Sequence, residues 1–532
     1  MKRIILILAV AASVCSAAYA GSADIIPQPS SITTGDGEYV LPERIVIRYG
    51  RRDLKKAAEY LKEIIAPSTG REVTLTRLGR GCIRLRIRKS AYPDDESYTL
   101  ISRSDRGVTV TASGYRGIVH GISTLRQLLP LQIESREAVS DIVWAVPEVE
   151  IRDTPKYGWR GLMLDTARHF FTVRETENLL DLMALYKFSK FHWHLSDNQG
   201  FRLEIPGYPA LSQMGAWRVE GDENIDKACL QREAEEGNED FRLNEECFRQ
   251  TDSGRVYGGN FTEKDVQEIV EFASVRGIDI IPEIDMPAHS RRAIQCYPWM
   301  KCDPEGSRIS PLCVGNDSVM QYARDVYREV FRLFPGKYVH IGGDEVCRDY
   351  WEKCPLCLKR VEDEHLDGIT SLQGWFTREM EKYFTENGKT LIGWEEILGA
   401  GLSSDAVAQW WTSQGTEALD KAAARGGRII CSPSAYLYFD HAETPETLRG
   451  LFEAQIVPEG YEDIVLGLQG NIWTELIPSE ARLQYMTFPR ALVLAEKSWS
   501  GASGSWEEYL SRMDMHCLRL QTMHVKYSSV GL

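Results

Sequence analysis

The sequence is poor in the patterns that mark several large classes of protein. Its 43 glycines and 22 prolines among 532 residues are too few for a collagen-like or low-complexity chain. No internal repeat with a period of about 20–50 residues is evident. The formal net charge is −15, and no block of lysine and arginine interrupts this acidic balance. Because nucleic-acid phosphates require clustered cations, the composition argues against a nucleic-acid partner.

Long apolar runs are missing everywhere except near the N-terminus. Residues 4–12 form an unbroken apolar run that follows two basic residues, and Ala18-Tyr19-Ala20 then has the small-x-small pattern of a signal-peptidase site. The run is too short to span a bilayer, and no later segment reaches about 18 apolar residues. We therefore expect residues 1–20 to be a cleaved signal peptide. The mature chain is expected to be periplasmic or secreted and to have no transmembrane segment.

Cysteine is present but gives no clear framework. Of the twelve cysteines, Cys15 lies in the expected leader, where a lipid anchor is less favoured because the preceding Val14 is bulky. An odd number remains, so at least one thiol is unpaired within a single chain. One Cys354-x-x-Cys357 spacing is a weak zinc signal, because a structural site needs four ligands. In an exported protein, disulfides or buried thiols are the favoured interpretation.

The first part of the mature chain has a mixed pattern. Between about residues 24 and 150, short β-branched runs are interrupted by two segments, 54–65 and 117–129, with apolar residues at helical spacing. This predicts an α+β accessory domain over residues 21–153, ending near Asp153-Thr154-Pro155. No constellation of catalytic residue types occurs within it.

From Trp159 onward, strand-like and helix-like segments alternate. The strand candidates are residues 161–164, 190–194, 278–283, 338–341, 390–393, 406–409, 428–431 and 464–468. The amphipathic helices are residues 175–186, 263–275, 320–334, 375–387, 417–424 and 481–497. This predicts an α/β fold, a (β/α)8 TIM barrel over residues 154–532, with its active site at the carboxyl ends of the strands. The polar, acidic stretch of about residues 218–258 is predicted to be an inserted loop that forms a lid or rim.

Chemically distinctive residues collect just after the predicted strands. They are Asp197, His289, Asp344, Glu345, Trp394, Trp411, Tyr438, Asp440, Trp473 and Glu475. Each alone has a simpler explanation, because adjacent acids often cap helices, a lone histidine is usually structural and a tryptophan is usually core. Their convergence on one barrel mouth favours a functional site.

An opening lined by aromatic rings and carboxylates is the kind of site that binds a sugar. Aromatic rings pack on pyranose C–H faces, and carboxylates and arginine hold hydroxyls. Cleavage of a glycosidic bond needs a carboxylic acid for the leaving oxygen and stabilisation of positive charge at the anomeric carbon. Asp344 and Glu345 are adjacent, so they need not face each other across the bond as the usual pair does. One of them could instead serve a nucleophile carried by the substrate itself.

Six motifs carry a resemblance to a known family. The motifs span residues 159–171, 190–200, 281–285, 340–345, 394–397 and 471–475, and they read WRGLMLDTARHFF, KFHWHLSDNQG, IPEID, HIGGDE, WEEI and NIWTE. In order and spacing they resemble glycoside hydrolase family 20, the exo-β-N-acetylhexosaminidases. The resemblance covers nearly the whole mature chain, since residues 24–150 are similar to the small accessory domain of that family.

The resemblance implies a mechanism and a substrate. Glu345 is implied to be the general acid and then the general base. Asp344 is implied to orient the 2-acetamido group of the substrate, which attacks the anomeric carbon to give an oxazolinium-type intermediate and retained configuration. The implied substrate is an oligosaccharide or glycoconjugate with a terminal, non-reducing, β-linked N-acetylhexosamine, and no cofactor or metal is implied.

The resemblance also implies substrate-binding roles. Tyr438 is implied to donate to the acetamido oxygen, Trp394 and Trp411 to enclose its methyl group, and Trp473 to stack under the ring. The hydroxyls of the terminal sugar are implied to be bound by Arg160, Asp440 and Glu475. Asp197 and His289 are implied to form a relay to Glu345 that tunes its pKa.

Two other classes of function remain open from the sequence. A metal-dependent hydrolase on the same barrel would draw its ligands from His192, His194, Asp197, His289, His340 and Asp344. Packing is the simpler explanation of His192 and His194, because Phe191, Trp193 and Leu195 surround them in sequence. A non-catalytic carbohydrate-binding protein is the second alternative. The preference between N-acetylglucosamine and N-acetylgalactosamine and the oligomeric state are left open.

Overall fold

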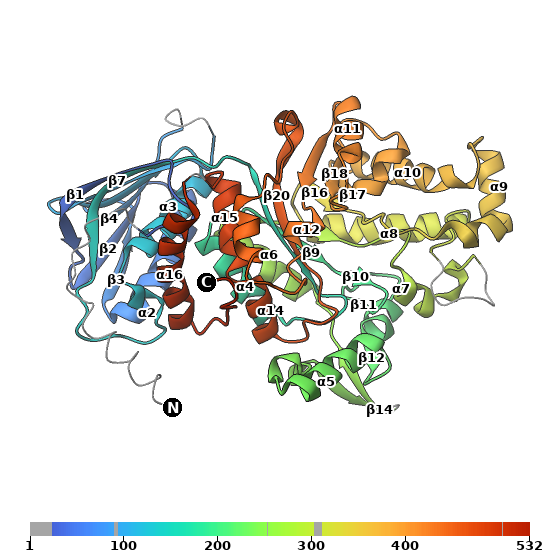
Figure 1. Cartoon of the computed structure of the whole chain (residues 1–532), viewed down its shortest axis with the longest axis horizontal. Coiled ribbons are helices and arrows are strands. Elements are labelled where there is room, and N and C mark those ends of the chain that lie inside the picture. The colour runs from blue at the N-terminus through green and yellow to red at the C-terminus, as the bar shows by residue number, and fades with distance from the viewer. Residues whose placement is uncertain (1–23, 90–93, 253, 303–310, 503) are drawn as a thin grey trace. The chain divides into compact units, whose positions relative to one another are not determined.

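The computed structural model describes residues 24–89, 94–252, 254–302, 311–502 and 504–532 (Figure 1). The predicted signal peptide lies outside them. The described chain divides into two compact units, one formed by Pro29–Thr154 and the other by Pro155–Leu532 together with Ile26–Gln28. Among the described residues, no helix has both the length and the apolar character needed to cross a membrane.

The first unit is a seven-stranded mixed sheet with two helices. Its strands are β1 (Ser31–Val40), β2 (Arg44–Tyr49), β3 (Glu72–Thr76), β4 (Ile83–Ile87), β5 (Tyr98–Arg103), β6 (Gly107–Ala112) and β7 (Ala145–Asp153), in the order β1-β7-β5-β6-β4-β2-β3. The helices are α2 (Lys55–Thr69) and α3 (Tyr115–Leu128). Gly121 lets α3 approach the sheet, because a Cβ there would lie 2.3 Å from Cγ1 of Val110. The predicted α+β class is confirmed.

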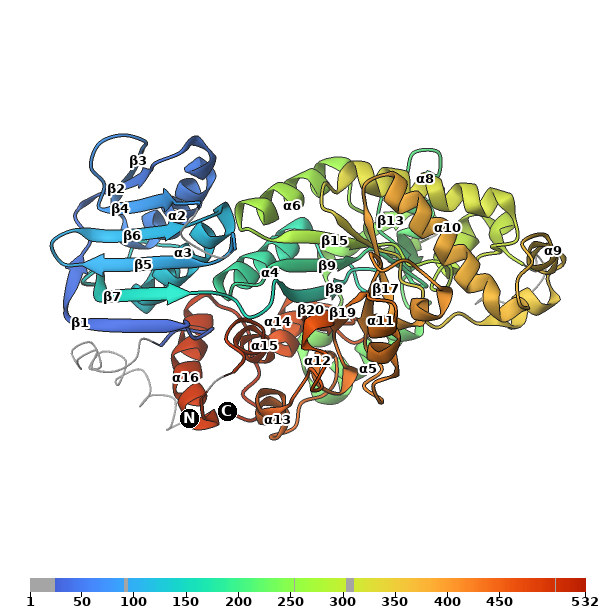
Figure 2. The same ribbon diagram turned by 90° about the horizontal axis from the view of Figure 1, so that it is seen from above.

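The second unit is built on a closed barrel of eight parallel strands, as predicted. The strands are β8 (Trp159–Asp165), β9 (Lys190–His194), β15 (Asp279–Glu283), β16 (Tyr338–His340), β17 (Thr390–Trp394), β18 (Val407–Trp410), β19 (Arg428–Cys431) and β20 (Val465–Ile472). Each coincides with a predicted strand, because a strand buried on both faces reads as a short apolar run. Figure 2 shows β15, β9 and β8 side by side, and their pairing is parallel.

Helices surround the barrel. They are α4 (Val173–Leu185), α6 (Glu263–Val275), α7 (Arg291–Cys296), α8 (Asp317–Leu333), α9 (Pro355–Asp363), α10 (Leu372–Glu386), α11 (Glu417–Ala424), α12 (Ser434–Leu437), α13 (Thr447–Glu453), α14 (Glu480–Thr487), α15 (Arg490–Trp499) and α16 (Trp506–Thr522). Reciprocal caps start three of them, Thr172 with Glu175, Thr262 with Asp265 and Ser505 with Glu508. The single helix predicted over residues 481–497 is wrong: the chain breaks at Pro489, which lacks the N–H that a continuous helix needs.

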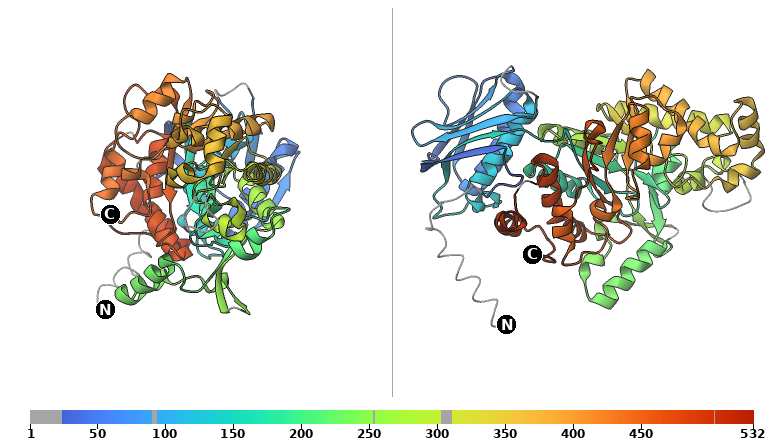
Figure 3. Two further views of the ribbon diagram at one scale, coloured as in Figure 1. Left: turned by 90° about the vertical axis from the view of Figure 1, so that its right-hand side faces the viewer. Right: turned by 45° about the horizontal axis from the view of Figure 1, so that its top comes forward.

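The acidic insertion is not the predicted loop. Its strands β12 (Trp217–Val219), β13 (Phe248–Thr251) and β14 (Gly254–Gly258) form an antiparallel sheet, and α5 (Asn224–Glu236) lies between β12 and β13 in the chain. A buried ion pair ties sheet to helix, with Arg218 Nε 2.9 Å from Asp226 Oδ2. Figure 3 shows α5 projecting at the margin of the barrel unit. The prediction failed because charged residues that are paired and buried read, in sequence, as a solvated loop.

Candidate active site

The acidic pair sits at the carboxyl end of β16, after two glycines in the left-handed conformation. Gly342 and Gly343 have φ values of 73° and 89°. A Cβ on Gly342 would lie 2.0 Å from Asp285 Oδ1, so only glycine lets the chain pass this carboxyl group. Glu345 has φ 51° and His289 has φ 45°, a region that side chains rarely adopt. Strain of this kind gathers at functional sites.

His289 links the acidic pair to Asp197. Its Nδ1 lies 3.1 Å from Asp197 Oδ1, and its Nε2 lies 3.5 Å from both Asp344 Oδ2 and Glu345 Oε2. Burial would lower the pKa of His289, but Asp197 and Asp344 outweigh it and raise that pKa well above its ordinary value. The imidazole is therefore held as a cation between carboxylates.

Asp197 is the charged end of this chain of contacts. Arg168 lies 2.9 Å from its Oδ2, and His194 Nε2 lies 3.0 Å from the same oxygen. Burial would raise the pKa of Asp197, yet Arg168 and His289 hold it well below its usual range. The structure thus brings Asp197, His289 and Glu345 together in the predicted order.

Asp344 and Glu345 lie in different surroundings. Burial raises the pKa of Asp344, whereas the hydrogen bond with His289 lowers the pKa of Glu345, whose side chain is 61% exposed. Within the described residues, Asp344 Oδ1 is buried and has no donor directed at it. A buried acceptor of this kind is matched to an N–H of a ligand.

Asp285 is a site residue that the sequence reasoning missed. It follows β15 and accepts the Gly343 N–H at 3.2 Å. Burial and the charge of Asp344 raise the pKa of Asp285 well above its ordinary value. The charge of Asp344 therefore acts directly on the Asp285 carboxyl group. The signal was available, because this residue ends the motif at 281–285.

Four aromatic side chains line the same mouth. The Trp394 and Trp473 rings lie 5.7 Å apart, Trp473 and Tyr438 6.2 Å apart, and Tyr438 stacks on Trp411 at 6.1 Å. Trp394 is fixed from below, since its Nε1 donates to Glu283 Oε1 at 3.0 Å. Burial raises the pKa of Tyr438, which keeps its hydroxyl protonated as a donor.

The structure contradicts the predicted place of Arg160. This residue lies near the start of β8, at the opposite end of the barrel from the acidic pair. Its Nε donates to the Lys187 carbonyl at 2.8 Å, and its guanidinium lies over the Trp499 ring. Arg160 is therefore a buried structural residue. The prediction took the wrong one of two arginines in the motif at 159–171.

The other arginine of that motif, Arg168, occupies the mouth. It lies 2.9 Å from Asp165 Oδ2 and 3.3 Å from Glu475 Oε1, and its guanidinium covers the Trp473 ring at 4.9 Å. Knowing where the strand ends would have found it, because β8 stops at Asp165 and active-site residues follow the strand.

Three further carboxyl groups border the aromatic residues. Burial raises the pKa of Asp440 to about 6 and also raises the pKa of Glu475. Burial, and then the charge of Asp344, raises the pKa of Glu396 to about 7. Glu396, which the sequence reasoning did not single out, receives the Trp411 indole N–H at 3.3 Å.

A histidine–carboxylate network fills the barrel beneath the tryptophans. The side chains of His192, His340 and Glu283 bring ligand-type atoms within 4.8 Å of one another, so this group is able to hold a metal ion. Protein partners already engage it, since His192 lies 3.0 Å and His340 2.9 Å from Glu283, and His192 Nδ1 meets Gln469 at 2.8 Å. Polar contacts, rather than the apolar packing expected from sequence, therefore account for the strand histidines.

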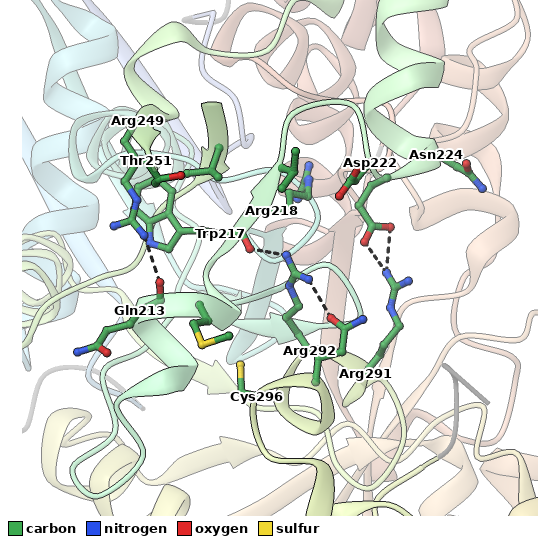
Figure 4. Close-up of a pocket in the computed structure, with 15 residues that line it drawn as sticks. Gln213, Trp217, Arg218, Asp222, Asn224, Arg249, Thr251, Arg291, Arg292 and Cys296 are labelled. Carbon is green, nitrogen blue, oxygen red and sulfur yellow. Dashed lines mark hydrogen bonds and ion pairs between the residues drawn. The ribbon is translucent and has the colours of Figure 1, made fainter. Parts of the chain in front are cut away.

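A separate cavity lies in the inserted segment. It has a volume of about 810 Å³ and contains none of the predicted site residues. In Figure 4, Arg249 lies over the Trp217 ring, and Arg291 and Arg292 extend from α7. A smaller neighbouring pocket shares Arg291 and also includes Asn198, the residue after Asp197. The cavity therefore lies next to the site of Asp344 and Glu345 but is lined by none of its catalytic or aromatic residues.

Comparison with protein families covers both units. The profile described as "Glycosyl hydrolase family 20, catalytic domain" matches residues 157–502, and "Glycosyl hydrolase family 20, domain 2" matches residues 22–154. A β-hexosaminidase of Porphyromonas gingivalis is 34% identical over 95% of this chain, which spans 64% of that relative's length. A β-hexosaminidase of Vibrio furnissii is 31% identical over 90% of this chain and 76% of its own.

Solved structures share the whole fold. An N-acetyl-β-hexosaminidase of Streptomyces plicatus, in complex with thio-NAglucal, superposes with a TM-score of 0.80 at 30% identity, covering 96% of this chain and 97% of its own. A family 20 exo-β-N-acetylglucosaminidase of Vibrio harveyi, in complex with N-acetylglucosamine, gives a TM-score of 0.82 at 27% identity, covering 96% and 79%.

Proposed function

This chain belongs to glycosyl hydrolase family 20, and we propose that it removes terminal, non-reducing β-linked N-acetylhexosamine with retention of configuration, using the 2-acetamido group of the substrate as nucleophile. One observation carries the proposal: adjacent Asp344 and Glu345 each lie 3.5 Å from His289 at an aromatic-lined barrel mouth. This arrangement provides one buried carboxylate to orient a group and one exposed carboxyl to exchange a proton with a leaving oxygen.

The first step forms one bond and breaks another. Asp344 accepts the acetamido N–H, the acetamido oxygen bonds to the anomeric carbon, and the bond from that carbon to the leaving oxygen breaks. Glu345 gives its proton to the leaving oxygen. Because the nucleophile belongs to the bound sugar, the entropic cost of bringing in a second reactant is avoided. Asp344 stabilises the positive charge that develops on the amide, and Asp285 fixes the backbone just before Asp344 by accepting the Gly343 N–H.

The second step reverses these roles. A water molecule gives its proton to the Glu345 carboxylate and its oxygen bonds to the anomeric carbon, while the bond from that carbon to the acetamido oxygen breaks. Two displacements on opposite faces return the original configuration.

The proton on Glu345 is shared with His289. In the free protein His289 is cationic and Glu345 ionised, since Asp197 and Asp344 raise the pKa of His289, and the hydrogen bond with His289 lowers the pKa of Glu345. Substrate covers Glu345, and loss of water from a carboxylate raises its pKa, which moves the proton toward Glu345. Asp197 fixes the imidazole for this transfer.

The far side of the sugar meets a charged wall. Arg168, Asp440 and Glu475 border the Trp473 ring, and their donors and acceptors suit the hydroxyl groups of a terminal residue. Such a wall of paired charges would block a further sugar on the non-reducing side, in keeping with an exo-acting enzyme. Arg168 takes the role that the sequence assigned to Arg160.

The leaving group extends toward the inserted segment. Asn198, the residue after Asp197, lines a small pocket together with Glu223 and Arg291. Glu223 and Arg291 also line the cavity of Figure 4, so the small pocket connects the surroundings of Glu345 with that cavity. Its arginines, carboxylates and Trp217 suit the hydroxyls and ring faces of an oligosaccharide or glycoconjugate. Breaking the Arg291–Glu223 pair by Arg291→Ala should raise KM for a chitooligosaccharide more than KM for a nitrophenyl glycoside. An equal effect on both substrates would contradict this placement.

Export is the remaining part of the proposal. Its support is the basic start, the apolar run at 4–12 and the Ala18-Tyr19-Ala20 cleavage pattern. N-terminal sequencing of the protein recovered from outside the cytoplasm should begin near Gly21. Full-length protein retained in the cytoplasm would contradict export.

The decisive experiment follows the product and two variants. Hydrolysis of nitrophenyl β-N-acetylglucosaminide and β-N-acetylgalactosaminide should give the β anomer first by NMR, and the ratio of the two rates sets the sugar preference. Glu345→Gln should nearly abolish turnover of substrates with poor leaving groups, and Asp344→Asn should lose about 10²–10³-fold in kcat. Binding without turnover would support a carbohydrate-binding protein, and a first-formed α anomer would support direct attack by water, as in a metal-dependent hydrolase.

A further inference from the structure

Four cysteines far apart in the sequence converge outside the catalytic mouth. They are Cys302, Cys313, Cys354 and Cys357, whose Sγ atoms all lie within 4.8 Å of one another. Three of the four are fully buried, and Cys302 is partly so. Among the described residues no disulfide is formed. Of the two arrangements favoured from the sequence, disulfides or buried thiols, this cluster adopts the second.

Two turns hold the four thiols in place. Cys354 precedes Pro355, the first residue of α9, and Cys357 follows in the first turn of that helix. On the other side, the Cys313 N–H donates to the Met300 carbonyl at 2.8 Å. The two sides touch closely, because a Cβ on Gly315 would lie 2.4 Å from the backbone nitrogen of Cys357.

We propose that these four cysteines bind one structural zinc ion as a tetrahedral thiolate site. With zinc–sulfur bonds of about 2.3 Å, tetrahedral geometry places the sulfurs about 3.8 Å apart. The measured separations are 3.7 Å for Cys302–Cys357, 3.6 Å for Cys313–Cys354 and 3.8 Å for Cys313–Cys357. A disulfide would require about 2.05 Å. Four thiols arranged in this way match zinc, and coordination also protects them from oxidation.

Zinc binding is linked to the protonation of the four thiols. A thiolate is the form that binds zinc. The thiols therefore release protons on metal binding, so the affinity rises with pH.

The site joins the two segments that carry the catalytic residues. The Leu312 N–H donates to the carbonyl of Pro287, two residues before His289, at 2.9 Å. The Trp351 indole donates to the Leu312 carbonyl at 3.0 Å, and Trp351 belongs to the segment that follows Glu345. Figure 1 shows α9 at the margin of the barrel unit. Zinc here is structural: it fixes the segment after β15 against the segment after β16 and touches no substrate.

Metal analysis of the full chain tests the proposal directly. Protein purified without chelators or metal-affinity resin should contain one zinc per chain by mass spectrometry of the elements, and X-ray absorption should show four sulfur neighbours. Replacement by cobalt should give the intense visible bands of a tetrahedral cobalt thiolate. Protein that lacks zinc and fails to bind it stoichiometrically would overturn the site. Iron in its place, or peptide mapping that finds these cysteines in disulfides, would also do so.

Matched variants separate the site from a general effect of losing a cysteine. Cys357→Ser should lose zinc and lower Tm, and Cys302→Ser, at the partly buried position, should weaken zinc binding with a smaller change in folding. Cys517→Ser, a buried cysteine of α16 outside the cluster, should keep one zinc per chain. If the Cys302→Ser variant folds and holds zinc as tightly as the parent, the ligand assignment is wrong.

Discussion

The contacts that run from Asp197 through His289 to Glu345 predict a change in the pH dependence of activity that a purely structural role of Asp197 would not produce. Asp197→Asn keeps the size and hydrogen-bonding capacity of the side chain and removes its charge. Asp197 Oδ1 lies 3.1 Å from His289 Nδ1. At an effective dielectric constant of about 20, two unit charges at about this distance attract by about 5 kcal/mol. Arg168 draws on the same carboxylate, so this figure is an upper limit.

The direction of the change follows from the charges. Asp197 raises the pKa of His289, so removing its charge lowers that pKa, by about one to three units for a contact of this kind. The proposed mechanism predicts that activity falls at high pH, when the proton shared by His289 and Glu345 is lost. The alkaline limb of the kcat/KM profile should therefore move to lower pH.

The assay is the pH dependence of kcat/KM for the parent and for Asp197→Asn on one nitrophenyl N-acetylglucosaminide. Thermal unfolding of both proteins at each pH serves as the control. An alkaline limb that does not move, or moves to higher pH, would refute the relay even if the variant were slower at every pH.

Other substitutions test neighbouring parts of the site. Arg168→Lys should lower kcat/KM by about 10–100-fold, as expected for lost charge-assisted hydrogen bonds. Arg160→Lys should lower Tm and leave kcat/KM near the parent value. Equal kinetic effects of the two variants would contradict the placement of Arg168, rather than Arg160, at the active site. Gly342→Ala should nearly abolish activity because its Cβ collides with Asp285, while Gly388→Ala, at φ 70° with open space around it, should cost about 1–2 kcal/mol of stability and no activity. Asp285→Asn should retain more of kcat than Asp285→Leu, since the amide oxygen keeps an acceptor for the Gly343 N–H; equally large losses in both would show that the carboxyl group itself is needed.

Much of the barrel could be predicted because the features that determine its strands and helices are local in the sequence. A strand buried on both faces is a short apolar run, and the helices show their periodicity and caps in the sequence. The residues at the strand ends followed from those strands. The break at Pro489 was readable as well, because proline inside a helical pattern ends or kinks the helix.

The remaining features depend on contacts that the sequence does not display. The choice between Arg160 and Arg168 is an exception, because the predicted strand at 161–164 already placed Arg168 after it and Arg160 before it. The inserted segment is charged, and its order comes from pairs such as Arg218 with Asp226, which only the fold brings together. The four-thiol cluster joins Cys302 and Cys357, which are 55 positions apart, so its second pair of ligands could not be recognised by spacing.

The central claim is that the acetamido oxygen of the substrate is the nucleophile, and its electron density can be varied without touching the protein. Fluorine atoms introduced one at a time into the acetyl methyl group make this oxygen less nucleophilic while the leaving group stays the same. If the claim is right, kcat falls steeply with each added fluorine in the parent enzyme. A kcat that is indifferent to fluorination would contradict it.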